Sequence, residues 1–315
     1  MLLLLLACVG SSDTKDFPPV IWGDPETGLD DTGVATADDT GDDTGAVDDT
    51  GDDTGPVTSD EVCYPGPAED WTACLPVIPW SEGWGDDYAY PEPLNDSPQY
   101  ARPLYFIDLA EADPDMALAP NFVLDEFMQE WKGRYGLFMP HVVETLQAIR
   151  DNIGGPLVIN SGYRNVTYNA GVGGATWSRH MYGDAADMAS SVASLDELGE
   201  ICDLMGAGYI GYYEAHIHCD WRDDPLEPAF YGARRSNVLA PRPALGAILR
   251  WDGEAWTAPA EGWDEGEPLR VWTAEDARGK AIVHETTRRF VPPPGTAQVR
   301  VDVGHAVWLM AHQPD

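Results

Sequence analysis

The stretch SRHMYGDAADM, residues 178–188, places a histidine and an aspartate seven positions apart in a chain that has only seven histidines. A second stretch, YYEAHIHCDW at residues 212–221, carries two further histidines on either side of one isoleucine. Zinc in proteins is held by imidazole nitrogens and carboxylate oxygens, and a catalytic zinc has three protein ligands and one open position. Together the two stretches contain the residue types that such a site needs.

The segment YIGYYEAHIHCDW, residues 209–221, contains the second stretch and is rich in β-branched and aromatic residues, which predicts one strand. Side chains alternate across a strand, so His216 and His218 are expected to share one face. His180 and Asp187 are too far apart for one helical turn, but a loop through Gly183 can lead into a strand and turn both side chains inward. The spacing therefore allows one imidazole, one carboxylate and a second imidazole to meet.

The chain from residue 137 to 221 alternates helical and strand signals. Residues 137–153 have apolar side chains at helical intervals and end at a Gly-Gly pair, whereas PLVINSGYR at 156–164 predicts a buried strand. Residues 194–206 begin with a Ser-x-x-Glu capping box and continue with an apolar stripe. The order helix, strand, loop, helix, strand predicts a compact α+β unit, which we assign to residues 121–237.

The flanking regions have different compositions. Residues 62–120 are rich in Pro, Trp and Tyr and are expected to wrap around the next domain. Residues 238–315 contain short strand signals separated by Gly, Pro and Asp, which predicts a small all-β domain. The tryptophans of this last region either form its core or present a stacking face for glycans.

Residues 9–61 predict a disordered acidic tether. The unit Asp-Asp-Thr-Gly occurs five times between residues 30 and 55, with almost no large apolar side chain between copies. Such a segment cannot bury enough surface to offset the entropy of ordering. The alternative is calcium binding, because aspartate repeats supply oxygen ligands.

Charge excludes one class of partner. The formal net charge is −36, and residues 13–61 hold sixteen acidic side chains against one lysine. Because binding to nucleic acid requires positive groups that neutralise phosphates, we expect no nucleic-acid partner.

The N-terminal residues 1–8, MLLLLLAC, predict a lipoprotein signal with Cys8 as the lipidated residue. The alternative is a chance apolar start, since no basic residue precedes the leucines. The first interpretation places the protein outside the cytoplasm, anchored by lipid to the membrane of a bacterial cell envelope.

Four cysteines remain, an even number that suggests disulfides in an exported protein. Cys63 and Cys74 flank a short Pro-containing loop and are the expected pair. Cys202 and Cys219 either form a second pair or stay as buried thiols.

The stretch SGYRNVTYNAGVGGATWSRHMYGDAADM, residues 161–188, resembles the core motif of M15-type zinc D-Ala-D-Ala peptidases and related peptidoglycan endopeptidases. In that family Ser-x-His, a glycine and Ala-x-Asp supply two metal ligands, which implies that His180 and Asp187 bind zinc. The stretch GYYEAHIHCDW, residues 211–221, resembles the corresponding strand of hedgehog signalling domains, which share the fold and the zinc site. This resemblance implies that His218 is the third ligand.

The same resemblance implies roles for three more residues. Glu214 takes the place of the general base, although it lies four residues before His218 where the bacterial peptidases place their acid three before. His216 is expected to stabilise the oxyanion, and Arg164 resembles the arginine that pairs with a substrate carboxylate.

The resemblance thus implies a hedgehog/D-Ala-D-Ala-peptidase-like α+β zinc domain followed by the small all-β domain. The expected activity is zinc-dependent cleavage of peptidoglycan peptide stems or cross-links, as a carboxypeptidase or an endopeptidase. The alternative is a non-catalytic, zinc-containing module that binds wall or protein. A calcium-responsive adhesin that uses the aspartate repeats is a third hypothesis.

Overall fold

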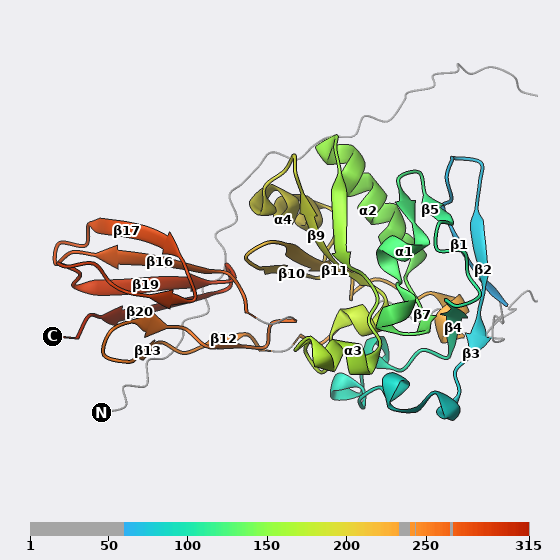
Figure 1. Ribbon diagram of the computed structural model, residues 1–315, viewed down its shortest axis with the longest axis horizontal. Coiled ribbons are helices and arrows are strands. Elements are labelled where there is room, and N and C mark those ends of the chain that lie inside the picture. The colour runs from blue at the N-terminus through green and yellow to red at the C-terminus, as the bar shows by residue number, and fades with distance from the viewer. Residues whose placement is uncertain (1–59, 233–239, 243, 265–266, 315) are drawn as a thin grey trace, which may run out of the picture. The chain divides into compact units, whose positions relative to one another are not determined.

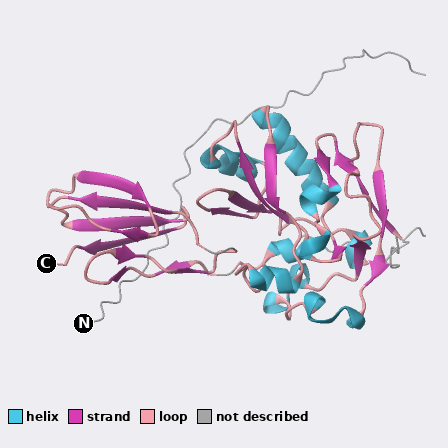
Figure 2. Ribbon diagram, in the orientation of Figure 1, coloured by secondary structure: helices cyan, strands magenta, loops and turns pink. Residues whose placement is uncertain are grey.

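The computed structural model describes residues 60–232, 240–242, 244–264 and 267–314 (Figure 1). Cys8, the predicted signal and nearly all of the predicted acidic tether lie outside these residues. Helices and strands both occur up to residue 232, and from residue 246 onward the described elements are strands (Figure 2). The architecture is therefore mixed α and β, as the sequence predicts.

The central element is an antiparallel sheet in which Figure 1 shows β9 and β11 side by side. Its strands, in spatial order, are β10 (Tyr209–Tyr212), β11 (Ile217–Asp220), β9 (Ala185–Ser190) and β8 (Leu157–Ser161). One face contributes Ala186, Met188, Ile217 and Cys219 to the main core, which also contains side chains of the two long helices. Because side chains alternate across strands, Asp187 and His218 lie on the opposite face.

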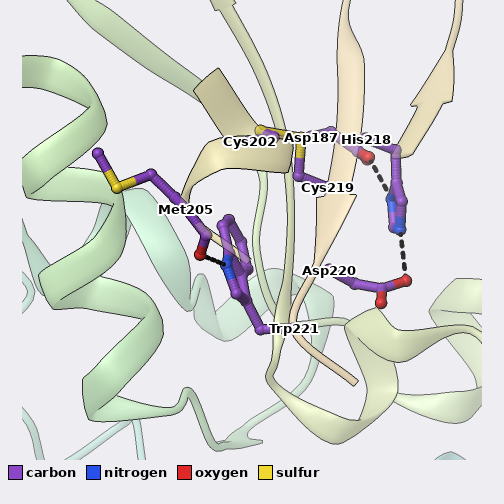
Figure 3. The surroundings of a disulfide bond; sticks show 7 residues. All are labelled: Asp187, Cys202, Met205, His218, Cys219, Asp220 and Trp221. Carbon is purple, nitrogen blue, oxygen red and sulfur yellow. Dashed lines mark hydrogen bonds and ion pairs between the residues drawn. A yellow bond between two sulfur atoms is a disulfide. The ribbon is translucent and has the colours of Figure 1, made fainter. Parts of the chain in front are cut away.

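The two long helices are α2 (Pro140–Ile153) and α4 (Leu195–Leu204). α2 has a proline in its first turn and ends at Gly154, whose φ of 64° is the left-handed conformation that glycine adopts easily. α4 begins with the predicted capping box, in which the Ser194 side chain accepts from the Glu197 backbone N–H. The Cys202–Cys219 disulfide joins α4 to β11 (Figure 3).

The prediction of one strand over residues 209–221 is wrong, because the chain reverses within it. β10 ends at Tyr212 and β11 begins at Ile217, and the two pair antiparallel with Tyr212 opposite Ile217. The Tyr213 N–H donates to the His216 carbonyl at 3.1 Å and closes the turn. This turn contains neither Gly, Pro, Asn nor Asp, so the usual sequence signal for a reversal is missing.

Residues 60–139 form short elements around this core. Cys63 of β1 and Cys74 of β2 are directly opposite each other and form a disulfide. Aromatic side chains of this region, including Tyr64 and Phe106, are buried in the main core.

The remaining elements up to residue 231 are β1 (Glu61–Tyr64), β2 (Ala73–Pro76), β3 (Ile78–Pro79), η1 (Glu82–Tyr88), η2 (Leu94–Asp96), η3 (Pro98–Tyr100), β4 (Tyr105–Asp108), β5 (Ala117–Ala119), β6 (Phe122–Val123), α1 (Leu124–Phe127), η4 (Glu130–Lys132), β7 (Tyr135–Gly136), α3 (Val166–Gly171), η5 (Arg179–Tyr182) and α5 (Pro228–Tyr231).

Residues 246–312, here called the C-terminal β region, contain three small sheets and a second core. The strands are β12 (Gly246–Ala247), β13 (Arg250–Trp251), β14 (Trp256–Thr257), β15 (Ala260–Glu261), β16 (Arg270–Glu275), β17 (Ala281–Thr286), β18 (Arg289–Phe290), β19 (Gln298–Val303) and β20 (Val307–His312). Trp256, Trp263 and Trp272 are buried in this core, whereas Trp308 is 54% exposed. Most of the tryptophan surface therefore serves packing.

Every helix in the described part of the chain is too short or too polar to cross a bilayer.

Candidate metal centre

Three side chains from distant positions converge on the sheet face opposite the helices. His180 lies in η5, Asp187 in β9 and His218 in β11, where it is directly opposite Asp187. His180 Nε2 is 3.1 Å from Asp187 Oδ1 and 3.1 Å from His218 Nδ1, and His218 Nδ1 is 2.9 Å from Asp187 Oδ1. Zinc bonds of about 2.0–2.2 Å place tetrahedral ligands slightly more than 3 Å apart, so these donor atoms fit one ion.

The other nitrogen of each imidazole has a fixed partner. His180 Nδ1 lies 2.6 Å from the Gly162 carbonyl, which only accepts, so Nδ1 carries the proton and Nε2 presents a lone pair. His218 Nε2 donates to Asp220 Oδ2 at 3.3 Å, which leaves Nδ1 for a metal (Figure 3). Such outer hydrogen bonds select the tautomer and the ring orientation that a metal needs.

Asp187 is held from behind by a buried arginine. The Arg164 guanidinium donates to Asp187 Oδ2, and Arg164 Nε donates to Ser161 Oγ at 2.8 Å. Arg164 is only 2% exposed. The prediction that Arg164 binds a substrate carboxylate gets no support from this geometry, because its guanidinium is engaged with a candidate metal ligand and is closed off from solvent. It is a positioning residue for Asp187.

The charges around the site favour a cation. Burial lowers the pKa of His218, but the carboxylates of Asp264, Asp187 and Asp220 outweigh it and raise the pKa to about 10. Burial raises the pKa of Asp187, but His180, His218 and Arg164 hold it well below its usual range. Three buried carboxylates around two imidazoles therefore provide an environment in which a divalent ion is compensated.

Glu214 is not among the converging groups. It lies in the turn between β10 and β11, its side chain is 48% exposed, and its carboxylate pairs with Arg288 at 3.1 Å. The candidate ligands, in contrast, have side chains at most 2% exposed. This geometry gives no support to the prediction that Glu214 is the general base, which stays a prediction. The prediction assumed an uninterrupted strand, and the reversal after Tyr212 moves Glu214 to the outside.

His216 lies in the same turn. Its ring stacks on Tyr213 with centroids 4.7 Å apart and an interplanar angle of 12°. Tyr213 belongs to the core of the C-terminal β region. The predicted common face of His216 and His218 depended on one strand, and His216 now lies before β11 begins. This contact gives no support to its predicted role toward an oxyanion.

Two residues of the site were not predicted. Asp220 lies two positions after His218 on the same strand face, and its carboxylate also accepts from Arg222 Nε at 2.7 Å. Because side chains alternate along a strand, the spacing of two residues from His218 could have indicated that Asp220 lies on the same face. Asp264 comes from the C-terminal β region, and its Oδ2 lies 3.7 Å from His180 Nε2 and 3.5 Å from His218 Nδ1. No spacing rule links Asp264 to either histidine.

A cavity of about 70 Å³ adjoins the site. Asp264 is one of its lining residues, and Tyr209, whose ring centroid is 5.7 Å from that of His218, is another. The remaining walls come from both parts of the chain: Ala175, Trp177, Arg222, Arg242, Leu245 and Gly262. The cavity offers aromatic and cationic groups beside the candidate ligands.

Comparison with known proteins shows what the segment around the site is similar to. Residues 120–220 match the family model described as Peptidase M15. Over 80 residues the chain is 40% identical to the zinc D-Ala-D-Ala carboxypeptidase of Streptomyces albus G, covering 23% of this chain and 31% of that protein. The chain thus spans about a third of the length of that relative. His180, Asp187 and His218 lie inside the matched segment, and Asp264 lies outside it.

Proposed function

We propose, from the match of residues 120–220 to the Peptidase M15 family model and the similarity to a zinc D-Ala-D-Ala carboxypeptidase, that the chain is a zinc-dependent peptidase that acts on the peptide stems or cross-links of peptidoglycan. The predicted resemblance to this family is confirmed by the match. The observation that carries the proposed activity is the convergence of His180, Asp187 and His218 within 3.1 Å of one another.

These three side chains hold the zinc. When bound there, zinc lowers the pKa of water toward about 7 and polarises a scissile carbonyl. Gly162 and Asp220 fix the two imidazoles through the nitrogens that face away from the ion. Arg164 fixes the carboxylate of Asp187, so each ligand has an outer partner that prevents it from turning away.

We infer that the substrate peptide approaches from the side of the cavity beside Asp264, which at about 70 Å³ is too small for a peptide in this conformation. Trp177 and Tyr209 provide apolar surface, and Arg242 provides a partly exposed guanidinium that pairs with Asp223 at 2.7 Å, while Arg222 is held by Asp220. A guanidinium fork suits a carboxylate, which peptide stems carry. Removal of a terminal residue and cleavage of a cross-link are both compatible with this proposal, and the assay described below distinguishes them.

The remaining organisation is part of the same proposal. We assign the zinc peptidase domain to residues 121–237, with residues 62–120 wrapped around it, and a small β domain to residues 238–315. Residues 9–61 serve as a spacer after lipidation at Cys8, which anchors the protein to the bacterial envelope. The two disulfides among the described residues agree with an oxidising compartment.

A second candidate function is a zinc-containing module without catalysis that binds wall or protein. The observation that favours it is the position of Glu214, which pairs with Arg288 away from the ligands. A hydrolytic zinc site needs a group that takes the proton of the attacking water, and Glu214 does not reach it in this conformation.

The test uses the full chain loaded with zinc and two purified substrates, a pentapeptide muropeptide and a cross-linked dimer, with products followed by mass spectrometry. We expect zinc-dependent cleavage of one substrate that His218→Ala abolishes. Loss of one D-alanine identifies a carboxypeptidase, and conversion of dimer to monomers identifies an endopeptidase. If the natural chain and Asp264→Ala both retain zinc and cleave neither substrate, the non-catalytic module is the better account.

A further inference from the structure

Asp264 enters the metal centre from the C-terminal β region. Its side chain is 6% exposed, and its Oδ2 accepts from Ser178 Oγ at 2.8 Å. Its backbone carbonyl accepts from the Ala175 N–H, also at 2.8 Å. Asp264 is therefore hydrogen-bonded to the segment that precedes His180, and its Oδ2 also lies close to the candidate ligands His180 and His218.

The distances from Asp264 are those between two ligands of one ion. Oδ2 lies 3.7 Å from His180 Nε2 and 3.5 Å from His218 Nδ1, and in the described part of the chain these three residues form one of two groups able to hold a metal. The other group contains Cys63 and Cys74, which are joined in a disulfide. Tetrahedral ligands at about 2.0–2.2 Å from zinc are separated by slightly more than 3 Å, close to the observed values.

The charges around Asp264 also indicate that it binds a cation. Asp187 is neutralised by Arg164, and Asp220 by Arg222. The ion-pair partners of Asp264 among the described residues are His180 and His218. A buried carboxylate is costly unless it is paired or bound to a metal, and two imidazoles with their lone pairs turned inward pair with it best through a shared cation.

The segment around Asp264 is held in place by the C-terminal β region. Gly262 has a φ of 91°, and a Cβ there would lie 2.3 Å from the Ala244 carbonyl oxygen. Trp263 is buried in the second core, where the absence of a side chain at Gly304 makes room for its indole. Packing on the β-region side thus fixes the residue that precedes Asp264.

We propose that Asp264 is a fourth protein ligand of the zinc, supplied from outside the M15 segment, and that in this conformation it occupies the position a catalytic zinc keeps open. The inference rests on the proposed zinc site. It describes a latent form of the enzyme, in which the C-terminal β region must release Asp264 before a substrate can bind.

A role for Asp264 as the general base is less consistent with the distances. A base hydrogen-bonds to the attacking water at about 2.6–3.2 Å, and therefore lies one shell further out than the ligands. Asp264 Oδ2 is nearly as close to the two ligand nitrogens as they are to each other, at 3.5 and 3.7 Å against 3.1 Å. This spacing is that of a ligand.

The test replaces zinc by Co²⁺ in the full chain and compares the natural protein with Asp264→Ala, Asp264→Asn and the control Asp252→Asn. Asp252 is an exposed aspartate of the same β region, paired with Arg289. Visible absorption reports the coordination of cobalt, and titration with acetohydroxamate reports whether a position is open. Circular dichroism shows that each variant is folded, and the isosteric asparagine serves if the alanine variant is not.

We expect both Asp264 variants to change the cobalt spectrum, to bind the metal on the order of tenfold or more weakly and to bind hydroxamate at least about tenfold more tightly. Their peptidase rate should rise, and Asp252→Asn should match the natural chain. Unchanged spectra and hydroxamate affinity in both variants would overturn the proposal. An unchanged spectrum together with abolished cleavage would also overturn it and would identify Asp264 as the base. If the natural chain and Asp252→Asn bind no cobalt, the zinc site itself fails.

Discussion

Asp187 and His218 are directly opposite each other on β9 and β11, and Asp187 Oδ1 lies 2.9 Å from His218 Nδ1. Two ligands are thus fixed by the register of one antiparallel pair. A slip of either strand by one residue would turn the ligand on that strand toward the helix-covered face. The Cys202–Cys219 disulfide ties the next residue of β11 to α4 and so opposes such a slip.

Replacing Glu214 by glutamine tests whether Glu214 is the general base. Because Glu214 is half exposed and pairs with Arg288, we expect peptidase activity within about twofold of the natural chain and little change in the free energy of unfolding. Steady-state kinetics on muropeptides and urea denaturation measure both quantities. A fall in kcat of a hundredfold or so, with zinc retained, would restore Glu214 as the base.

Arg164→Met separates a positioning role from substrate binding. The variant leaves Asp187 buried without its guanidinium, which should destabilise the metal-free protein by on the order of 3–5 kcal/mol. Zinc affinity and kcat should fall together. Competition with a chromogenic chelator and a KM measurement check this. A raised KM at unchanged zinc affinity would instead show that Arg164 binds the substrate carboxylate.

Asp220→Asn tests the outer partner of His218. Loss of the carboxylate removes the acceptor that orients the imidazole, so zinc should bind roughly 10- to 100-fold more weakly. Burial raises the pKa of Asp220, but Arg222 and His218 together lower it, so the carboxylate is ionised at neutral pH. Zinc titration of this variant beside Asp252→Asn gives the comparison, and equal affinities would remove Asp220 from the site.

The interaction of His305 with two carboxylates predicts a pH dependence. His305 Nδ1 is 2.9 Å from Asp302 Oδ2, and Nε2 is 3.8 Å from Asp196 Oδ1 of α4. The hydrogen bond to Asp302 raises the pKa of His305. Partial burial opposes this increase, and the charges of both aspartates add to it.

A raised pKa in the folded state stabilises the protein most below the unfolded value of about 6.5, and the contribution is lost as the pH rises through the folded value. We expect NMR titration of His305 to give a pKa above about 6.5 that Asp196→Asn decreases. The difference in urea midpoint between the natural chain and His305→Gln should shrink with rising pH above neutrality. A difference that grows with pH would contradict the assignment.

The sequence predicted the parts of the fold that depend on local periodicity. The apolar spacing and Gly-Gly end of residues 137–153 and the Ser194–Glu197 capping box correspond to α2 and α4. The reversal at residues 213–216 was missed, because its residues resemble those of the adjoining strands. This one error displaced Glu214 and His216, since both assignments relied on alternation along a single strand.

The sequence predicts the site only in part, and this too has a physical reason. His180, Asp187 and His218 lie in motifs with fixed spacing, so their convergence could be anticipated. Arg164 was placed in the right neighbourhood, but only tertiary packing decides whether its guanidinium points to Asp187 or to solvent. Asp264 is separated from His218 by a stretch with no periodic relation to it, and it reaches the site through the packing of Trp263.

The most direct test of the account is the zinc content of the full chain and of His218→Ala, measured by native mass spectrometry after dialysis against a weak chelator. We expect one zinc ion per natural chain and its loss in the variant, because His218 Nδ1 lies within 3.1 Å of His180 Nε2 and of Asp187 Oδ1. A natural chain without zinc, or a His218→Ala variant that keeps it, would contradict the metal centre described above.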